Sequence, residues 1–289
     1  MNNHVPSNVI VIYNMQISVI VPTYKPQSYL WECLNSIYNQ TFSKSDYELV
    51  LVLNGCNEPF HSQIKDWLGK HSDLQVQFSQ TDEGGVSNAR NIALDNAKGE
   101  YITFIDDDDL ISPAYLEELY DKVAPDTVSL CYPYAFNDGY IEKQLPYVIT
   151  KAYDYCVKHN SQNIIYMARK YLSGPCMKLI PMSFIHDRRF DVRFRNGEDS
   201  LFMFLISDKM KQVTFTSKKA VYYRRYRQGS ALFSMTLKQC VVNSFQLIKS
   251  YSQIWSKRPF EYSFVLYITR VLGAFHYCMR YIQYNYFRH

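Results

Sequence analysis

The 289-residue chain is long enough to bury a large core in one domain, or in one domain with an extension. Its 47% hydrophobic and 20% charged residues are ordinary for a globular protein. Seven cysteines form no CxxC pair and no metal-ligand spacing, which argues against a zinc site and favours reduced thiols. The sequence contains no internal repeat and no low-complexity tract.

Charge is distributed unevenly along the chain. From Lys209 onward there are 14 Lys and Arg residues and one acid, Glu261, which gives this part a net charge of +13. Because the whole chain has a net charge of +4, the first 208 residues carry −9. Such an asymmetry indicates that the C-terminal part meets a polyanion: a membrane surface, a nucleic acid or a diphosphate. We expect no nucleic-acid partner, because no zinc-finger, RNP-like or basic-arm motif is present and the first part is acidic.

The chain begins with an expected N-terminal extension over residues 1–14. It lacks a basic flank followed by an apolar core and a cleavage site, which predicts no secretory signal and a cytoplasmic location. Strands and helices then alternate: the spacing of apolar residues predicts strands at 17–21, 48–53 and 74–78, and helices at 28–40, 60–69 and 88–97. Gly99 is expected to end the last of these helices as a C-cap. Alternation with short links is typical of a parallel sheet with right-handed crossovers.

The next strand opens directly into an acidic stretch. Residues 101–105 form an apolar run that is typical of a buried parallel strand, and four carboxylates follow, Asp106 to Asp109. Ligand crevices form at the C-terminal ends of such strands, and a divalent cation would relieve the repulsion among the acids. The alternative is a solvated acidic turn ahead of the helix that we expect from Ser112-Pro113 to about residue 123.

The pattern loosens in the second half of the chain. Strands are predicted at 127–134, 213–216 and 220–223, and a helix at 200–206. Residues 137–143 read as a turn and 151–172 as partly helical, and from about residue 236 the chain looks helical to its end.

Several polar features fall where a doubly wound sheet builds one site. Pro22, Thr23 and Tyr24 follow the first strand, Asn54 follows the second, and Arg90 lies in the first turns of a helix expected to begin after Ser87. Each has an ordinary explanation as turn chemistry or a solvated arginine. The coincidence of all of them with the acidic stretch at one edge of the sheet favours a ligand site.

Taken together these stretches resemble the inverting glycosyltransferases of family 2, which have the GT-A nucleotide-sugar fold. The matching stretches are 17–24, 49–55, 85–91 with 98–102, 104–109 and 197–199, within residues 15–230. The resemblance implies an α/β fold with a mostly parallel, Rossmann-like sheet flanked by helices and a C-terminal helical extension. It divides the domain into a nucleotide-sugar half, 15–125, and an acceptor half, 126–235.

The resemblance also implies a role for each matching residue. The donor nucleotide would contact Pro22, Thr23, Tyr24, Asn54, Arg90, Asp106 and Asp107. Asn54 departs from the family, which usually has an aspartate there. Asp108 would hold Mn²⁺ or Mg²⁺, Asp199 would deprotonate the acceptor, and Glu198 and Arg227 would lie on the acceptor and diphosphate side. Asp199 could otherwise be a helix-start acid, and Arg227 part of a solvated basic loop.

The implied activity is a metal-dependent, inverting, hexosyltransferase-type reaction. The donor would be a UDP-sugar, and the acceptor a glycan or lipid-linked hydroxyl in bacterial surface polysaccharide synthesis. One alternative is a sugar-phosphate nucleotidyltransferase, although its glycine-rich loop is absent after the first strand. Another is a non-catalytic membrane-surface partner with the same fold.

The last segment, 236–289, lies outside the match. Residues 260–282 are rich in aromatic and aliphatic side chains but are interrupted by Glu261, Arg270 and Arg280, which disfavours a spanning helix. A helix lying in the interface fits better, and it predicts a peripheral protein on the inner face of the cell membrane. The alternative is packing on the catalytic domain or on a partner in a homo-oligomer.

Overall fold

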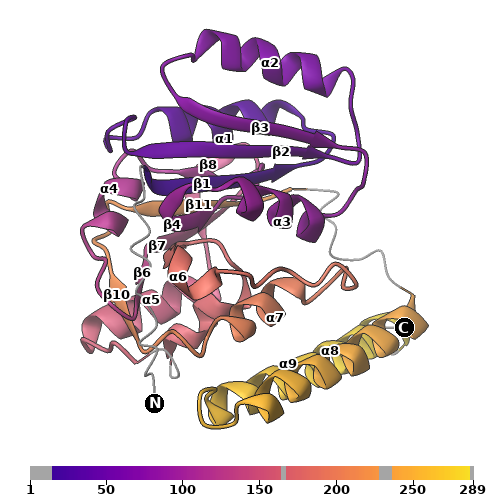
Figure 1. Ribbon diagram of the computed structural model, residues 1–289. Coiled ribbons are helices and arrows are strands. Elements are labelled where there is room, and N and C mark those ends of the chain that lie inside the picture. Colours follow the sequence, from indigo (N-terminus) through magenta and orange to yellow (C-terminus); the bar gives the residue numbers. More distant parts are fainter. Residues whose placement is uncertain (1–14, 164–166, 228–235, 287–289) are drawn as a thin grey trace, which may run out of the picture.

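A computed structural model describes residues 15–163, 167–227 and 236–286 (Figure 1). The expected N-terminal extension, 1–14, lies outside the described residues. The seven cysteines are all free thiols. Within the described part of the chain, no helix is both long enough and apolar enough to cross a membrane.

The first half of the fold is the predicted alternation of strands and helices. Its elements are β1 Met15–Thr23, α1 Ser28–Tyr38, β2 Tyr47–Asn54, α2 Phe60–Lys70, β3 Gln75–Thr81, α3 Val86–Asn96 and β4 Gly99–Phe104. The four strands are parallel neighbours in the order β4-β1-β2-β3. Every residue of β2 is buried, as its apolar run requires, and α1 and α3 cover opposite faces of the sheet (Figure 1).

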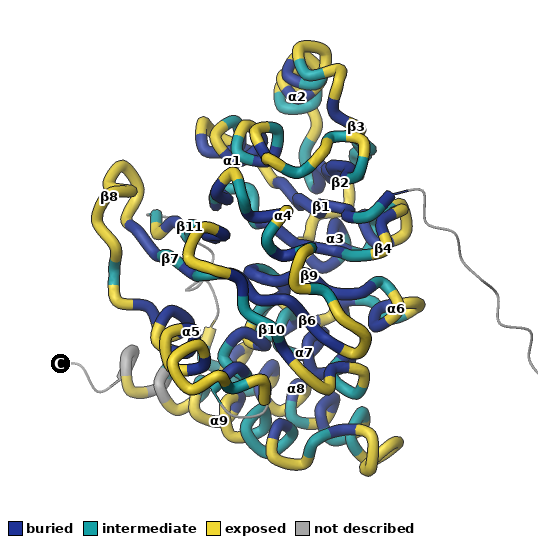
Figure 2. The backbone as a smooth tube through the Cα atoms, turned by 90° about the vertical axis from the view of Figure 1, so that its left-hand side faces the viewer, coloured by how far each residue is buried: buried dark blue, intermediate teal, exposed yellow. Residues whose placement is uncertain are grey.

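The second half is more irregular. Its elements are β5 Leu110–Ile111, α4 Tyr115–Tyr120, β6 Thr127–Leu130, β7 Tyr132–Asn137, β8 Tyr140–Leu145, α5 Val148–Lys158, the 3₁₀ helix η1 Met167–Ser173, β9 Lys178–Pro181, α6 Met182–Ile185, α7 Glu198–Leu205, β10 Gln212–Phe215 and β11 Val221–Tyr226. The central sheet runs β10-β6-β9-β4-β1-β2-β3, with β9 antiparallel to both neighbours, and a smaller sheet runs β5-β11-β7-β8. Burial concentrates along the central strands, whereas β8 is exposed (Figure 2).

Three local predictions at the ends of helices were wrong. Helix α3 begins at Val86 with Gly85 as its N-cap, so Ser87 lies inside the helix. Gly99 begins β4 and does not cap α3, because it packs against β1, where a Cβ would lie 2.4 Å from the Ser18 nitrogen. The helix expected from Ser112 begins later, at Tyr115, since Ser112 Oγ donates to the Lys219 carbonyl and accepts from the Val221 amide.

The C-terminal segment forms a helical hairpin, α8 Leu237–Lys257 and α9 Phe264–Tyr286. A capping box between Thr236 and Gln239 begins α8. The two helices pack against each other and against α7 (Figure 1). Polar contacts secure this packing: Asn243 Nδ2 donates to the Asn196 carbonyl at 2.9 Å, and the Tyr251 hydroxyl lies 2.7 Å from Ser200 Oγ. One face of the hairpin therefore packs against α7 and the residues before it.

Candidate active site

The polar ends of β1, β2 and β4 meet at one edge of the central sheet. Thr23, the last residue of β1, donates to Asp107 Oδ2 at 2.5 Å. Asn54, the last residue of β2, donates to the Thr23 carbonyl at 2.7 Å and accepts from the Gly85 amide at 2.9 Å. The exits of two strands and the start of α3 are thus joined by hydrogen bonds, as the right-handed parallel topology places them.

Two of the residues expected to contact the base differ sharply in exposure. Asn54 is 3% exposed, and both ends of its amide are bonded to backbone groups. Tyr24 is 51% exposed, and its ring edge lies close to Gly55, where a Cβ would be 3.2 Å from Tyr24 Cε2. Tyr24 therefore presents an aromatic face at the surface, while Asn54 lies beneath and fixes the loops around it.

Arg90 connects the two acidic stretches of the sequence. Its Nη2 donates to Asp106 Oδ1 at 2.9 Å, and its Nη1 donates to Asp199 Oδ1 at 2.5 Å. The side chain is 3% exposed and lies over the Phe190 ring. Although burial opposes its charge, the Asp199 and Asp106 carboxylates raise the pKa of Arg90. The cation therefore stays charged and holds carboxylates from distant parts of the chain at one place.

Arg90→Met is expected to lower the free energy of unfolding by about 3 kcal/mol, because it leaves two carboxylates without their shared buried cation. Urea denaturation monitored by circular dichroism measures this change. The matched control is Arg189→Met, which breaks a surface pair with Asp95 and should cost less than about 1 kcal/mol. Equal losses in the two variants would contradict a stabilising role for the Arg90 pair of contacts.

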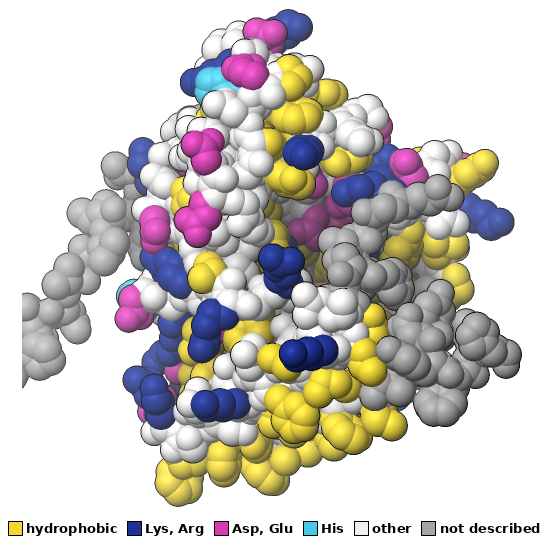
Figure 3. Space-filling view, turned by 90° about the vertical axis from the view of Figure 1, so that its right-hand side faces the viewer, with side chains coloured by type: hydrophobic (Ala, Val, Ile, Leu, Met, Phe, Trp, Pro, Cys, Tyr) yellow, Lys and Arg dark blue, Asp and Glu magenta, His cyan; other side chains and the backbone are white. Residues whose placement is uncertain are grey.

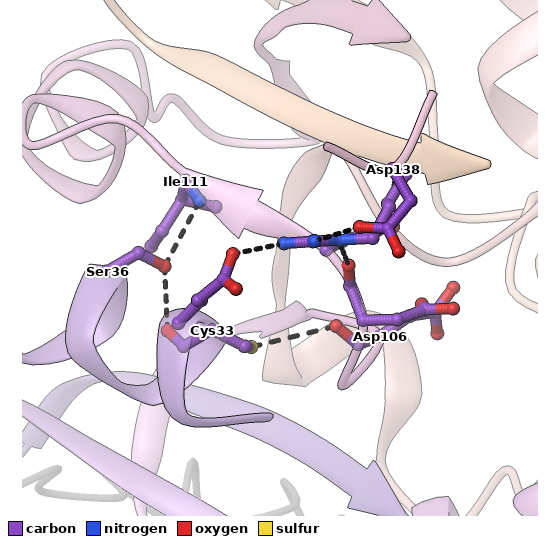
Figure 4. Close-up of polar contacts among 9 residues, drawn as sticks. Cys33, Ser36, Asp106, Ile111 and Asp138 are labelled. Atoms are coloured by element: carbon purple, nitrogen blue, oxygen red, sulfur yellow. Dashed lines mark hydrogen bonds and ion pairs between the residues drawn. The ribbon is translucent and has the colours of Figure 1, made fainter. Parts of the chain in front are cut away.

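The acidic loop after β4 is tied to α1 and β11. Cys33 Sγ lies 3.7 Å from the Asp106 carbonyl, and Ser36 Oγ accepts from the Ile111 amide, so α1 supports both ends of the loop (Figure 4). Asp109 is 3% exposed and accepts from the Arg225 amide at 2.7 Å. Asp109 is consequently a structural acid, whereas Asp107 and Asp108 are less enclosed.

Asp107 and Asp108 are the carboxylates best suited to a cation. Burial, together with the neighbouring Asp108 and Asp106 charges, raises the pKa of Asp107 to about 7. Burial and the Asp106 charge also raise the pKa of Asp108, although its Oδ2 accepts from Arg227 Nε at 2.7 Å. Crowded acids with incomplete compensation favour a bound cation.

The donor set limits which kind of metal site this can be. Among the residues that the structure describes, no three His, Cys, Asp or Glu side chains are grouped to hold a metal by themselves. Mg²⁺ and similar hard cations commonly take one or two carboxylates and complete their shell with substrate phosphates and water. The residues present fit a cation of that kind.

Arg225 of β11 and Arg227, one residue after the end of this strand, both contact the acidic loop. Arg225 Nε donates to the Asp108 carbonyl at 2.8 Å, and its two terminal nitrogens contact Glu32 and Asp138. Arg227 pairs with Asp108 and lies over the Tyr29 ring at 4.6 Å. Residues 228–230, which follow Arg227, lie outside the described residues.

A cavity of about 680 Å³ opens beside the Arg90 contacts. Its walls include Arg90, Asp106, Glu198, Asp199 and Arg224. They also include residues that the sequence did not single out, namely Tyr147, Gly174, Asn243, Tyr251, Arg270 and Tyr277. Tyr24 and Asp108 do not line this cavity; they lie at the exits of β1 and β4. The C-terminal hairpin supplies one wall, and no local pattern in its sequence pointed to that contact.

Glu198 and Asp199 begin α7 at the cavity wall. Burial and the Asp199 charge raise the pKa of Glu198 to about 7, and its buried Oε2 has no hydrogen-bond partner among the described residues. Burial also raises the pKa of Asp199, against the lowering effect of Arg90. With Oδ1 held by Arg90, the other Asp199 oxygen faces Gly174, where a Cβ would lie 3.8 Å from it. One carboxylate oxygen is thereby left toward the cavity.

Lys178 holds the wall opposite Asp199. The side chain is fully buried, and Nζ donates to the Gly174 and Cys176 carbonyls at 2.6 and 2.5 Å. Burial lowers the pKa of Lys178 to about 8. The Lys178 amine therefore fixes the bend from Gly174 to Cys176.

Lys178→Met should change how stability depends on pH. Between pH 8 and pH 10.5 the unfolded chain keeps the lysine proton and the folded protein has lost it, so the native protein gains stability as pH rises. The free energy of unfolding of the native protein, minus that of the variant, is expected to rise by about 2 kcal/mol from pH 7 to pH 10. Urea titrations of both proteins measure the difference, and parallel pH curves would contradict it.

Comparison with known proteins agrees with this geometry. The chain matches the family described as "Glycosyl transferase family 2" over residues 18–178. Its relatives include the minor teichoic acid biosynthesis protein GgaB of Bacillus subtilis, 28% identical over 76% of this chain and 24% of GgaB. Glycosyltransferase GlyA of Streptococcus pneumoniae is 30% identical over 74% of this chain and 31% of GlyA. The chain spans less than a third of the length of these two relatives.

Solved structures confirm the predicted GT-A fold. Staphylococcus aureus TarS residues 1–349 in complex with UDP-GlcNAc superpose with a TM-score of 0.71 at 24% identity, covering 94% of this chain and 75% of TarS 1–349. The mannosyltransferase PcManGT from Pyrobaculum calidifontis, in complex with GDP-Man and Mn²⁺, gives a TM-score of 0.61 at 17% identity, covering 96% of this chain and 76% of PcManGT. Because the family match covers more than half of the sequence, the chain belongs to glycosyl transferase family 2.

Proposed function

We propose that the chain is an inverting glycosyltransferase of bacterial surface polysaccharide synthesis, which moves a sugar from a UDP-sugar to a hydroxyl of a glycan or lipid-linked acceptor. The observation that carries the proposal is the bridge from Asp106 through Arg90 to Asp199. This bridge joins an acid of the loop after β4 to an acid at the start of α7, and all three residues line the same cavity. Family membership argues against the sugar-phosphate nucleotidyltransferase alternative.

Asp199 is proposed as the general base of the transfer. Its free oxygen accepts the proton of the acceptor hydroxyl, and the hydroxyl oxygen forms the new bond to the anomeric carbon of the sugar. The bond from that carbon to the diphosphate breaks, and its electron pair leaves with the nucleoside diphosphate. Arg90 keeps Asp199 ionised and oriented through Oδ1. One displacement from the opposite side inverts the anomeric centre.

On the donor side, Pro22, Thr23 and Tyr24 form the base site, with Asn54 positioning them from beneath. Asp106 and Asp107 are assigned to the ribose, and Asp107 is held by Thr23. Asp108, with Asp107 beside it, would hold Mn²⁺ or Mg²⁺, which when bound neutralises charge on the diphosphate. Arg227 is placed to contact the same diphosphate once it releases Asp108.

A screen of nucleotide-sugars with Mn²⁺ tests the donor assignment. UDP-, GDP- and TDP-sugars are incubated with the full chain, and the released nucleoside diphosphate is measured. We expect turnover with UDP donors alone. Equal turnover with GDP or TDP donors would show that the site built around Asn54 does not select uracil, and absence of turnover with every donor, with and without added acceptors, would overturn the enzymatic assignment.

The outer face of the C-terminal hairpin supports a peripheral membrane contact. Large apolar side chains are exposed there: Val242, Phe245, Phe260, Phe264, Val265, Leu272, Phe275 and Met279. Figure 3 shows apolar side chains gathered along one margin of the molecule with Lys and Arg groups close by. Apolar groups beside basic ones suit an anionic lipid surface. We therefore place the protein on the inner face of the cell membrane.

Vesicle sedimentation tests this contact. The native chain should sediment with vesicles that contain anionic phosphatidylserine, and Phe245→Ser combined with Phe275→Ser should weaken binding, with catalytic turnover of soluble substrates unchanged. The contrary result would be that the native chain does not bind such vesicles but forms a concentration-dependent dimer, which the double variant abolishes. This result would assign the face to a homo-oligomer instead.

A further inference from the structure

One wall of the cavity carries a cation that the proposed reaction does not use. Arg270 of α9 lines the cavity and forms no ion pair with any described carboxylate. Its one hydrogen bond among the described residues is long, 3.4 Å from Nη2 to the Arg169 carbonyl. Its Nε is buried and has no hydrogen-bond partner in that part of the chain. The guanidinium thus has donors available and no acid to neutralise it.

The position is unfavourable for folding alone. Burial, and Arg169 nearby, lower the pKa of Arg270, with Tyr251 acting in the opposite direction. Arg270 as a whole is half-buried, but its Nε is buried, and a desolvated cation without a counter-ion costs stability unless a ligand compensates it. A guanidinium in this position is best explained by an anion that binds to it.

The surroundings place that anion on the acceptor side. Tyr251 lies near both Arg270 and Glu198, and its hydroxyl contacts Ser200, one residue after Asp199. The cavity around Arg270 is also lined by Thr269 and Tyr277, which are hydroxyl-bearing, and by Asn243. The donor diphosphate belongs instead at Asp108 and Arg227, which do not line this cavity.

We propose that Arg270 forms a subsite for a phosphate group of the acceptor, so that the hydroxyl presented to Asp199 belongs to a phosphate-bearing molecule. The inference rests on the proposed glycosyltransferase function and adds the chemical class of its acceptor. A planar guanidinium matches two phosphate oxygens, and the hydroxyl groups around it suit a polyol or sugar. The phosphate belongs either to a polyol phosphodiester or to a prenyl diphosphate.

Calorimetric titration of the full chain, saturated with UDP and Mn²⁺ at fixed ionic strength, tests the subsite. The probes are sn-glycero-3-phosphoglycerol for the phosphodiester and farnesyl diphosphate for the lipid-linked source. Arg270→Gln is expected to weaken binding of the better probe by about 10- to 100-fold, with UDP affinity unchanged. Arg270→Lys should keep part of the affinity. The control Arg258→Gln, which removes an exposed arginine of the same hairpin, should bind like the native chain.

Thermal unfolding separates ligand binding from a structural role. Since Arg270 lacks a counter-ion, Arg270→Gln is expected to keep or raise the melting temperature of the ligand-free chain, by up to about 4 °C. A large fall in the melting temperature would show that Arg270 stabilises the fold, and would overturn the subsite. Equal binding of both probes by native chain and variant, or no binding to either, would also overturn it. Lower UDP affinity in Arg270→Gln would mean that Arg270 contacts the donor, and would overturn the acceptor subsite. Hydrolysis of the donor without acceptor tests the proposed glycosyltransferase function independently.

Discussion

Asp199→Asn is expected to lower the rate of sugar transfer by about 10³-fold while donor affinity changes by less than about twofold. The substitution keeps the shape of the side chain and an oxygen for Arg90, but it removes the basic oxygen that faces Gly174. Initial rates at saturating donor measure the loss, and calorimetry with UDP measures donor binding. Because only ionised Asp199 accepts a proton, native transfer should also fall as pH drops through its raised pKa.

The matched control for this prediction is Asp95→Asn, which removes an exposed acid that pairs with Arg189. It should transfer sugar at the native rate. Melting temperatures of both variants show whether the Arg90 contacts survive, since Arg90 keeps its bond to Asp106 when Asp199 loses its charge. A transfer rate for Asp199→Asn within tenfold of the native rate would assign the base elsewhere, with Glu198, which lines the same cavity, as the next candidate.

The first half of the fold could be predicted because its signals are local. Strands β1, β2 and β4 are short apolar runs; Thr23 and Asn54 are the last residues of β1 and β2, and Asp106 comes two residues after the end of β4. Parallel strands with right-handed crossovers leave their carboxyl ends at one edge, so position along the chain indicated position in space. The apolar face of α1 likewise followed from its spacing, with Leu30, Cys33, Leu34 and Ile37 buried.

What could not be predicted depends on contacts between distant segments. Strand β9 enters the sheet antiparallel between β4 and β6, and nothing in its four residues specifies those neighbours. Gly99 looked like a helix cap but is required by the close approach of β1, 81 residues away. For residues 260–282 the sequence left open an interfacial helix or packing on the rest of the chain or on a partner, and nothing in it showed that Arg270 would line the cavity.

The contact between Arg90 and Asp199 shows the same limit in a single bond. Arg90 and Asp199 lie 109 residues apart, and each alone has an ordinary reading as a helix arginine or a helix-start acid. The resemblance to family 2 brought them into one hypothesis, but only the folded chain shows the oxygen that Arg90 occupies. That detail matters for mechanism, because it determines which oxygen of Asp199 can accept a proton.

Asp108→Asn is expected to lower transfer by about 100-fold or more at a Mn²⁺ concentration that saturates the native enzyme. The reason is the loss of the carboxylate best placed to hold the cation. A bound cation stabilises the charge of the transition state by several kcal/mol, and about 1.4 kcal/mol corresponds to a tenfold change in rate. Transfer rates are measured against Mn²⁺ concentration after EDTA treatment. Chelation should abolish native transfer, and added Mn²⁺ or Mg²⁺ should restore it.

Arg227→Gln is the informative partner variant, because Arg227 Nε competes for the same Asp108 oxygen that a cation needs. Removing that competitor should lower the Mn²⁺ concentration for half-maximal transfer, while donor KM rises because a diphosphate contact is lost. Asp108→Asn should shift the Mn²⁺ dependence in the opposite direction. If both variants kept the native Mn²⁺ dependence, the cation would have to be held by Asp106 or Asp107. If EDTA left native transfer unchanged, Arg227 with Arg224 would be the groups that neutralise the diphosphate.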